Sequence, residues 1–311
     1  MFHVENEMPT IQTRQCIVSI FCALVCLSNF GTGCAPDSPA ELSRERLRKI
    51  NVLFETASGG NQYANIPGTE AGCLIVKVPH FRGGKVDHSW TDTDFKEAVG
   101  DLRNLDDLDY LLLRLTRITD RAMSDVASLT QLRHLNLSMT TVTDDGISKL
   151  APLRTLCGLY LDGARQITGV GMKSLNAETL QKLSLRGTAA SDETMGVLKD
   201  LVTLEHLDLG GTAIGDKTVS IVATLPKLKT LLLDRTAITD AGVRDLRQAK
   251  NLERLVICMN SQIKGDDLRE ICRLPRLAVL DISGTGVTKE SVFTLRGEFS
   301  HLQIDWFPEI K

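Results

Sequence analysis

One phrase recurs at a fixed spacing through most of the 311-residue chain, and this repetition limits the possible folds more than any other feature. Thirty-nine of the 45 leucines lie at or after position 101, so the leucine excess belongs to the repeated part. A period of this length is typical of a solenoid, in which each copy is one supersecondary unit stacked on the next. The eight copies, spaced by 24 residues and once by 25, open at Leu108, Leu132, Leu156, Leu180, Leu204, Leu228, Leu252 and Leu277.

The copy that opens at Leu228 shows what the phrase does physically. Leu231 and Leu233 are separated by one residue, so on a strand their side chains point to the same face. Ile238 and Leu246 then add apolar side chains from a loop and a helix. Because one copy cannot bury its apolar face alone, neighbours must stack with parallel strands about 4.8 Å apart. A strand and a helix differ in width, so the stack bends into an arc.

This phrase, with Ile-Thr-Asp before a helix, resembles the leucine-rich repeat family. It is closest to the 24-residue repeats of bacterial exported proteins and to the cysteine-containing, ribonuclease-inhibitor-like repeats. The resemblance implies an α/β fold: a curved, right-handed leucine-rich repeat solenoid with parallel strands on the concave face and helices on the convex face. It covers residues 105–300, which we interpret as eight leucine-rich repeats. It does not indicate a ligand.

A column of polar residues recurs beside the leucines. We expect these side chains to satisfy backbone groups that a buried turn leaves unpaired. Asn260 supplies once the inward-facing asparagine that the family usually has at this position, and Ala164 interrupts the column. An extra residue precedes Ile167 and Ile263, so these two turns should bulge. The other members of the column are Thr116, Thr140, Thr188, Thr212, Thr236 and Thr285.

An acidic column follows a few residues later in the phrase. A row of acids could hold cations, but one carboxylate per repeat does not provide the roughly six to eight oxygens that calcium prefers. We therefore expect threonine or aspartate to cap the convex helices, where a negative charge also suits the helix dipole. The column consists of Asp120, Asp144, Asp192, Asp216 and Asp240, each preceded by Thr, Ser or Gly.

The N-terminal end of the repeats needs a cover, because a solenoid would otherwise expose its core there. Residues 34–72 are interpreted as a tether and an N-terminal helix, the helix running from residue 41 to residue 54. Residues 73–104 are predicted to form an N-terminal cap or degenerate repeat. Within that cap we expect a strand at 73–78 and a helix at 91–102, with Thr91 or Asp92 near its N-cap.

The C-terminal end needs a cover as well. Residues 301–307 alternate polar and apolar side chains as an edge strand does, and Pro308 ends the pattern. Residues 301–311 are therefore predicted to be a C-terminal cap strand. We expect Trp306 to plug exposed core rather than to bind a ligand.

Residues 1–33 have the pattern of a secretory signal peptide. The apolar run at 16–27 would rise only about 18 Å as a helix, which is too short for a bilayer core of about 30 Å. The segment from Gly31 to Cys34 resembles the bacterial lipoprotein box, which implies acylation of Cys34. Ordinary cleavage near Gly33 or an uncleaved signal anchor is the alternative.

Composition and motifs exclude several classes of protein. The hydrophobic fraction of 42% and the charged fraction of 24% are typical of a globular chain, and a net charge of −3 gives no electrostatic case for nucleic acid. The cysteines beyond residue 33 are odd in number and without close pairs, so they do not form a disulfide framework. The chain has no phosphate-binding glycine loop, no HExxH and no zinc-type Cys or His spacing. We predict no catalytic residues, no cofactor and no metal.

The concave face carries the candidate binding residues. Strand positions between the buried leucines form three columns across the repeats, and in the first five repeats these columns hold aromatic and charged side chains. Such residue types are enriched at binding hot spots. The later repeats carry Leu232, Val256 and Val279, which would serve as a second contact or pack against a terminal segment. The predicted partner-binding residues are Tyr110, His134, Tyr160, Arg186, His206 and Asp208.

Together these features predict a non-enzymatic binding scaffold, exported to the cell envelope as a lipoprotein, secreted or periplasmic. It would hold a protein, or alternatively a glycan, and would meet the membrane only through a lipid or signal anchor. One alternative is an intracellular adaptor resembling the repeat half of ubiquitin-ligase receptors, although no helical recruitment domain is present. Another is an enzyme with its site in residues 41–100, around His80, Asp87 and His88.

Overall fold

The computed structural model describes residues 38–49, 53–56, 74–77, 81–82, 85–86 and 90–308. The chain divides into two compact units, Met1–Leu42 and Ser43–Lys311, and the account below concerns the second. No helix in the described ranges is long and apolar enough to cross a membrane. The predicted signal peptide lies outside the described residues, as do Cys34, His80, Asp87 and His88.

A single sheet runs through the second unit. Its strands lie in chain order, and every neighbouring pair from the second strand to the last is parallel. The solenoid predicted from the repeat is therefore confirmed. The eleven described strands of the sheet are β1 Leu53–Thr56, β2 Leu74–Lys77, β5 Leu108–Leu112, β6 His134–Asn136, β7 Gly158–Tyr160, β8 Lys182–Ser184, β9 His206–Asp208, β10 Thr230–Leu232, β11 Arg254–Val256, β12 Val279–Asp281 and β13 Gln303–Asp305.

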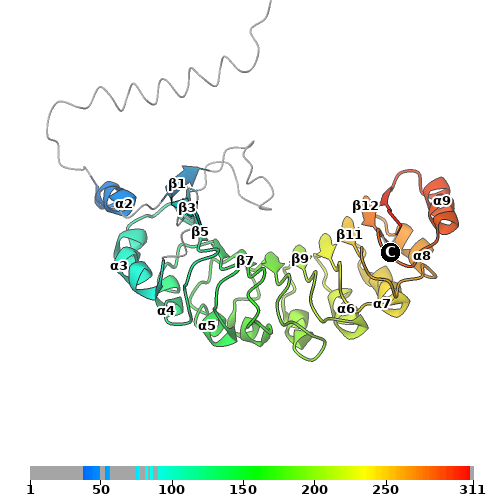
Figure 1. Ribbon diagram of the computed structural model, residues 1–311, viewed down its shortest axis with the longest axis horizontal. Helices are drawn as coiled ribbons and strands as arrows, with labels where there is room; N and C mark the ends of the chain where they lie inside the picture. Colours follow the sequence, from blue (N-terminus) through cyan, green and yellow to red (C-terminus); the bar gives the residue numbers. More distant parts are fainter. Residues whose placement is uncertain are drawn as a thin grey trace, which may run out of the picture. The chain divides into compact units, whose positions relative to one another are not determined.

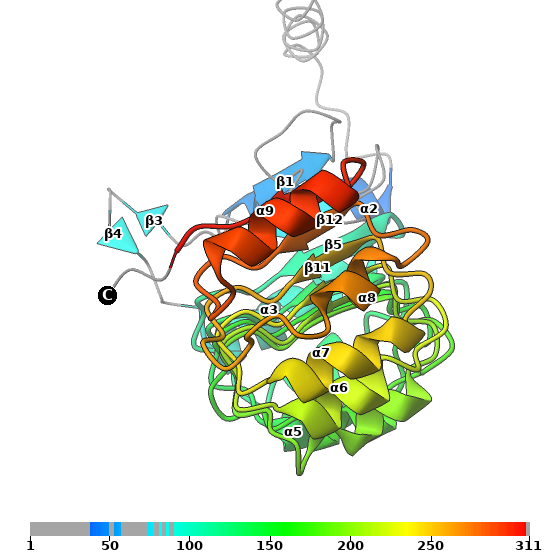
Figure 2. The same ribbon diagram turned by 90° about the vertical axis from the view of Figure 1, so that its right-hand side faces the viewer.

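Short helical segments return the chain from each strand to the next. Figures 1 and 2 show them on the outer side of the curved unit, with the strands on the inner side. Repeats three and four have 3-10 segments here instead of α-helices. The segments are α4 Met123–Val126, α5 Asp144–Ser148, η1 Val170–Ser174, η2 Met195–Asp200, α6 Asp216–Val222, α7 Asp240–Asp245, η3 Leu246–Gln248, α8 Leu268–Cys272 and α9 Lys289–Glu298.

The main core is a continuous cluster between the strands and the helical segments, running from Leu47 to Ile304. Ile75, Tyr110 and Leu112 form a second, small cluster, with Tyr160 packed against it. The repeated leucines are the chief members of the main cluster: Leu231, Leu233 and Leu246 are all 0% exposed. A fully buried leucine contributes about 2 kcal/mol relative to an exposed one. Since each leucine column touches the columns of adjacent repeats, this stabilisation exists only in the stack.

The polar column satisfies buried backbone carbonyls, as predicted. In each of its six threonines the hydroxyl donates to the carbonyl three residues earlier, for example Thr140 to Leu137 at 2.7 Å. Asn260 does more: its Nδ2 donates to the carbonyl of Leu233 in the preceding repeat at 2.8 Å, and its Oδ1 accepts from the Thr236 amide at 2.8 Å. The asparagine therefore joins two repeats, whereas each threonine closes its own turn.

The two repeats with an extra residue form an additional turn at the expected place. The amide of Ile167 donates to the carbonyl of Ala164 at 3.0 Å, and the amide of Ile263 donates to the carbonyl of Asn260 at 3.1 Å. In each case the hydrogen bond forms a turn that contains the added residue. The strands on either side therefore keep their register with the neighbouring strands.

Each repeat leaves its strand through one residue of left-handed backbone. Glycine holds this position in four repeats, and bulkier residues hold it in the other four, although only glycine adopts positive φ without steric cost. The stacked turns therefore impose this conformation even where the local sequence opposes it. The residues are Leu115, Met139, Gly163, Gly187, Gly211, Arg235, Met259 and Gly284, with φ between 54° and 67°.

The acidic column connects neighbouring repeats instead of capping its own helices. Asp216 is the first residue of α6, and its carboxylate accepts from the amide of Thr239 at 2.8 Å and from its hydroxyl at 2.7 Å. Thr239 is in turn the N-cap of α7. The predicted threonine caps are thus confirmed for α5 and α7, and Asp120 and Asp216 of the preceding repeats hold these two cap residues. Asp92 and Asp144 bind Thr119 and Thr168 of the next repeat in the same way, although these two threonines are not N-caps.

Small residues make room for these links. A Cβ added to Gly242, in α7, would lie 2.4 Å from the Oδ1 atom of Asp216. This explains why the phrase continues Thr-Asp-Ala-Gly: the glycine lets the carboxylate of the preceding repeat reach the helix N-terminus. Negative charge is also favourable there because of the helix dipole.

The expected helix at 41–54 is wrong at its C-terminal end. The helix α2 spans Pro39–Lys49, and β1 pairs with β2 in an antiparallel ladder, so residues 53–56 are a strand. Leu53, Phe54 and Thr56 suit a strand as well as a helix, and the free edge of β2 offers their backbone groups partners. Tertiary pairing thus overrides the helical spacing of the apolar residues.

The rest of the N-terminal segment folds close to expectation. The expected strand at 73–78 contains β2, which pairs in parallel with β5. The expected helix at 91–102 is α3 Asp92–Arg103, with Thr91 as its N-cap and a 2.7 Å bond from the Thr91 amide to Asp94. A small hairpin, β3 Phe81–Arg82 with β4 Lys85–Val86, lies between them in sequence.

At the C-terminal end, β13 pairs in parallel with β12 and forms the edge of the sheet. Trp306 packs against the core, as expected. Arg296 of α9 donates through Nη2 to the carbonyl of Ile304 at 2.7 Å. This bond occupies an edge carbonyl and discourages the pairing of further strands.

Removing a link between repeats should destabilise the whole stack. Replacement of Asp216 by alanine leaves the Thr239 amide without its acceptor, so we expect the free energy of unfolding to fall by about 1–2 kcal/mol. Urea unfolding followed by circular dichroism measures this loss. Glu193→Ala, which removes an exposed acid with no such contact, is the control. Equal losses in both variants would contradict a specific role for the link.

Candidate functional site

The structure aligns the concave residues in the columns that the repeat predicts. The first column of paired residues runs Tyr110, His134, Gly158, Lys182, His206, Thr230, Arg254 and Val279. The central column runs Leu112, Asn136, Tyr160, Ser184, Asp208, Leu232, Val256 and Asp281. Side chains that are far apart in sequence thus meet on one face.

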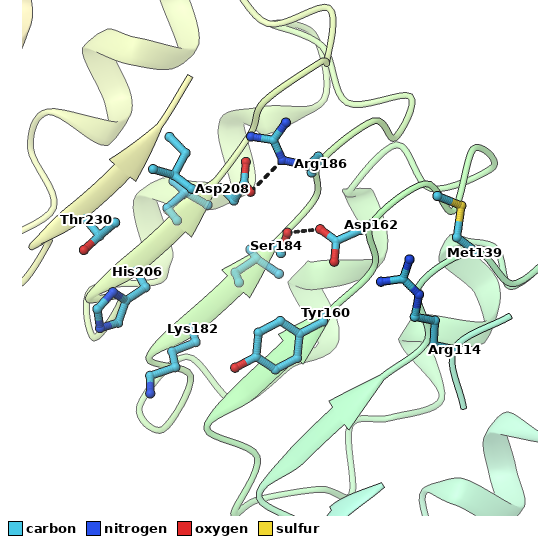
Figure 3. A pocket seen from close by; sticks show the side chains of 13 residues that line it. Arg114, Met139, Tyr160, Asp162, Lys182, Ser184, Arg186, His206, Asp208 and Thr230 are labelled. Atoms are coloured by element: carbon cyan, nitrogen blue, oxygen red, sulfur yellow. Dashed lines mark hydrogen bonds and ion pairs between the residues drawn. The ribbon is translucent and has the colours of Figure 1, made fainter. Parts of the chain in front are cut away.

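A hollow of about 450 Å³ lies on this face, and its lining comes mainly from repeats three to six. Figure 3 shows Tyr160, Lys182 and His206 along one side, and Asp162, Arg186 and Asp208 along the other. The volume is within the range of small-molecule and side-chain binding sites. The remaining lining residues are Arg114, Met139, Leu183, Ser184, Leu207, Thr230 and Leu232.

The structure separates the six predicted binding residues into two groups. Tyr160, Arg186, His206 and Asp208 line the hollow. Tyr110 and His134 are only 0% and 5% exposed, so they cannot offer their rings to a partner in this conformation.

Tyr110 is the centre of an aromatic stack. Its ring lies 5.7 Å from that of His134 and 6.2 Å from that of Tyr160, with interplanar angles of 21° and 27°. Burial raises the pKa of both tyrosines well above its usual value, so both are neutral hydroxyls at physiological pH. The stack therefore fixes Tyr160, the one member that lines the hollow.

Arg186 ties three repeats together beside the hollow. Its Nε donates to Asp208 at 2.9 Å, and its Nη1 and Nη2 donate to the two carboxylate oxygens of Asp234, the first at 3.0 Å. The hydrogen bonds to Asp234 raise the pKa of the Arg186 guanidinium. Burial raises the pKa of Asp208 despite its bonds from the Gly210 amide and Arg186. A bidentate pair of this kind holds geometry strongly.

The other side chains of the hollow are held in a similar way. Ser138 donates to Asp162 at 3.0 Å, and Ser184 donates to the second carboxylate oxygen. Burial, together with the charge of Lys182, lowers the pKa of His206, so His206 is a neutral imidazole at pH 7. Beside it, a 2.7 Å bond from Lys229 lowers the pKa of Glu205.

Sequence analysis missed several lining residues. Arg114 and Asp162 occupy the third column, which lies just past each strand, and Lys182 occupies the first. Asp234, also in the third column, does not line the hollow but holds Arg186. Their repeat positions could have identified them, because the hollow spans all three columns. Their mutual hydrogen bonds had no signal in the sequence, since partners 24 or 48 residues apart become neighbours only through stacking.

The described residues offer little for catalysis or metal binding. In these ranges no group of three or more His, Cys, Asp or Glu side chains is placed to hold a metal ion. Cys157, Cys258 and Cys272 are free thiols. Burial raises the pKa of Cys258 to about 11, so this thiol stays protonated and is a poor nucleophile.

A family model described as "Leucine Rich repeat" matches residues 128–151 and 201–220. These segments contain the opening leucines of the second and fifth repeats. No curated protein matches the chain in sequence.

Solved structures resemble the chain in fold. Internalin C2 of Listeria monocytogenes is 19% identical, with a TM-score of 0.52, over 70% of this chain and 92% of that one. An internalin (inlF) of the same bacterium is 20% identical, with a TM-score of 0.48, over 66% of this chain and 69% of its own. A leucine-rich repeat protein of Leptospira interrogans is 18% identical, with a TM-score of 0.44, over 66% and 62%. The chain is an α/β leucine-rich repeat solenoid, as the internalin C2 likeness and the sheet together show.

Protonation of His134 should weaken the stack at acidic pH. Its Nδ1 is buried with no hydrogen-bond partner among the described residues, and burial, reinforced by Lys182 and Arg133, lowers the pKa of His134 from 6.5 to about 4. Unfolded His134 takes up a proton near pH 6.5, whereas folded His134 resists it until about pH 4. The free energy of unfolding is therefore unaffected by this group above pH 6.5. It falls by about 3 kcal/mol as the pH drops from 6.5 to 4, because only the unfolded chain takes up the proton in this range.

Unfolding free energies measured between pH 4 and 8 test this. His134→Phe keeps a ring against Tyr110 but cannot titrate, so its pH profile should be flatter than that of the unchanged chain. Profiles of the same steepness would show that other groups cause the acid sensitivity.

Proposed function

We propose that this chain is a non-enzymatic scaffold that holds a protein partner in the concave hollow. The observation that carries the proposal is the hollow itself, about 450 Å³, with polar side chains fixed in place before any partner arrives. Arg186 is held by two carboxylates, Asp162 by two serines, and Tyr160 by the aromatic stack. Side chains that are already ordered lose little conformational entropy on binding.

The composition of the hollow favours a protein over a glycan. Tyr160 supplies the aromatic ring of the lining, and it already stacks on Tyr110, while Met139, Leu207 and Leu232 contribute apolar surface. Aromatic, arginine and methionine side chains together are typical of protein interfaces. A glycan stays the alternative ligand.

The same features argue against an enzyme at this face. Asp208 and Asp162 are engaged in hydrogen bonds, and His206 contacts neither of them by a hydrogen bond in the described structure. A general base needs a proton to abstract within hydrogen-bond reach and a partner that orients it. The proposal that the N-terminal segment holds an enzyme site concerns His80, Asp87 and His88, which lie outside the described residues.

Removal of the Tyr160 ring and the His206 imidazole from the hollow should strongly weaken partner binding. We expect Tyr160→Ala combined with His206→Ala to weaken binding about 30-fold or more, as loss of hot-spot side chains does. Affinity capture on the immobilised chain, with quantitative mass spectrometry, identifies the partner, and titration then measures its affinity. The matched control is Lys217→Ala with Arg247→Ala, two exposed changes on the helical side.

Circular dichroism must show that both double variants keep their fold. If the concave and the convex variants capture the same partners with equal affinity, the hollow is not the binding site. Loss of binding in the convex variant alone would move the site to the helical face.

We also propose that the chain is exported and anchored through Cys34. Support comes from the leader pattern of residues 1–33 and the box at 31–34. This proposal places the scaffold at the cell envelope and excludes the alternative of an intracellular adaptor resembling the repeat half of ubiquitin-ligase receptors.

Mass spectrometry of the mature N-terminus tests the anchor. We expect a peptide that begins at Cys34 and carries two or three acyl chains, found in the membrane fraction. Cys34→Ser should release the chain from that fraction. An unmodified peptide that begins at Met1 would overturn the anchor at Cys34, and if the chain is then absent from the membrane fraction it would overturn export as well. An unmodified peptide that begins near residue 34 would overturn lipidation and support secretion.

A further inference from the structure

We propose that the partner presents an acidic side chain to Arg114 at the rim of the hollow, next to an apolar side chain that fills the space beside Tyr160. This inference rests on the proposed function and specifies the chemistry of the partner. It comes from comparing the charged groups of the hollow with the partners that they have within the chain.

The carboxylates in and beside the hollow already accept hydrogen bonds within the chain. Asp208 accepts from Arg186 and from the Gly210 amide, at 2.9 and 2.8 Å. Asp162 accepts from Ser138 and Ser184. Asp234, which lies next to the lining, accepts twice from Arg186. Each of these carboxylates thus has fewer acceptor positions left for a basic side chain from a partner.

Arg114 differs from these groups. It lines the hollow and is exposed, and it makes no hydrogen bond or ion pair with any residue in the described ranges. Figure 3 shows its guanidinium between Met139 and Asp162, on the side of the hollow away from His206. A guanidinium presents a planar fork of donors that matches a carboxylate in a bidentate pair. Arg114 is thus the open donor of the site.

A second cationic group lies farther along the hollow. Lys182 belongs to the first column, three repeats from Arg114, and its charge contributes to the low pKa of His206. The charge of Lys182 also lowers the pKa of Glu205, so Lys182 already acts on acidic and imidazole groups of the chain. Arg186 is likewise held by Asp208 and Asp234. Arg114 belongs to neither group, and the positive charge of its exposed guanidinium attracts an anion.

The surface next to Arg114 is apolar. Met139 is 49% exposed, and it occupies the left-handed turn position directly after the strand of the second repeat. Methionine side chains adapt to irregular apolar partners. An acidic peptide segment with a neighbouring leucine-like side chain meets both requirements. An acidic sugar would meet only the first.

Binding of short labelled peptides to the full chain tests the inference. The probe is a fluorescein-labelled peptide rich in glutamate with one leucine, and the matched probes replace every glutamate by glutamine or by lysine. We expect the glutamate peptide alone to bind, with an affinity that falls as salt rises. Arg114→Gln should weaken it about tenfold, and Arg114→Lys less, because the charge stays while the fork is lost.

Arg121→Gln is the matched control, an exposed arginine of the same repeat that does not line the hollow. It should leave binding unchanged, and unfolding curves confirm that all three variants fold. Equal binding of the glutamine peptide, no effect of Arg114→Gln, or binding of an oligouronate but not of the peptide would each overturn the inference.

The proposed function can fail separately. If a captured partner depends on Tyr160 and His206 but the glutamate peptide does not bind, the scaffold proposal stands and this inference is wrong. If the peptide binds through Arg114 while the Tyr160 and His206 variant keeps its partners, the acidic contact stands and the proposed partner site is wrong.

Discussion

Burial of apolar side chains between adjacent repeats is the interaction on which the rest of this structure depends. Leu231 and Leu233 are fully buried, yet the strand and helical segment of a single repeat leave them open on both sides. The repeats on either side close these openings. The hydrogen bonds between the aspartates and the start of the helical segment in the next repeat, such as those between Asp216 and Thr239, lie across the same boundary, so hydrophobic and polar contacts stabilise the same junctions.

This dependence reaches the concave face. Arg186 contacts Asp208 and Asp234, which come from the next two repeats, and the aromatic stack joins the first three. The hollow is therefore a property of several junctions at once. Loss of stacking at one junction would disorder its lining before any lining residue changed. The rigid arrangement also explains how a face made of short strands can present fixed polar groups to a partner.

The repeat predicts which residues lie side by side on the concave face, but it does not predict which of them are exposed or which contact one another. The columns were predictable because parallel stacking places equivalent positions side by side. Of the predicted binding residues, Tyr160, Arg186, His206 and Asp208 line the hollow, and their role in binding stays a prediction. Exposure was not predictable: Tyr110 and His134 have the same column position as Lys182 and His206, yet they are buried. Arg114 and Asp234 belong to a predicted concave column but were left out of the predicted binding residues, because sequence spacing does not reveal which side chains hold one another.

The sequence by itself determined the solenoid, the strand register and the threonine column, since each depends on a pattern that repeats within one unit. Tertiary structure decided what depends on contacts between units or with the free end of the sheet. It made residues 53–56 a strand, because the edge of β2 was open to pairing. Tertiary structure also decided that the acidic column links repeats instead of capping its own helices. Stacking brings each carboxylate within hydrogen-bond distance of the helical segment in the next repeat, although the two are more than twenty residues apart in sequence.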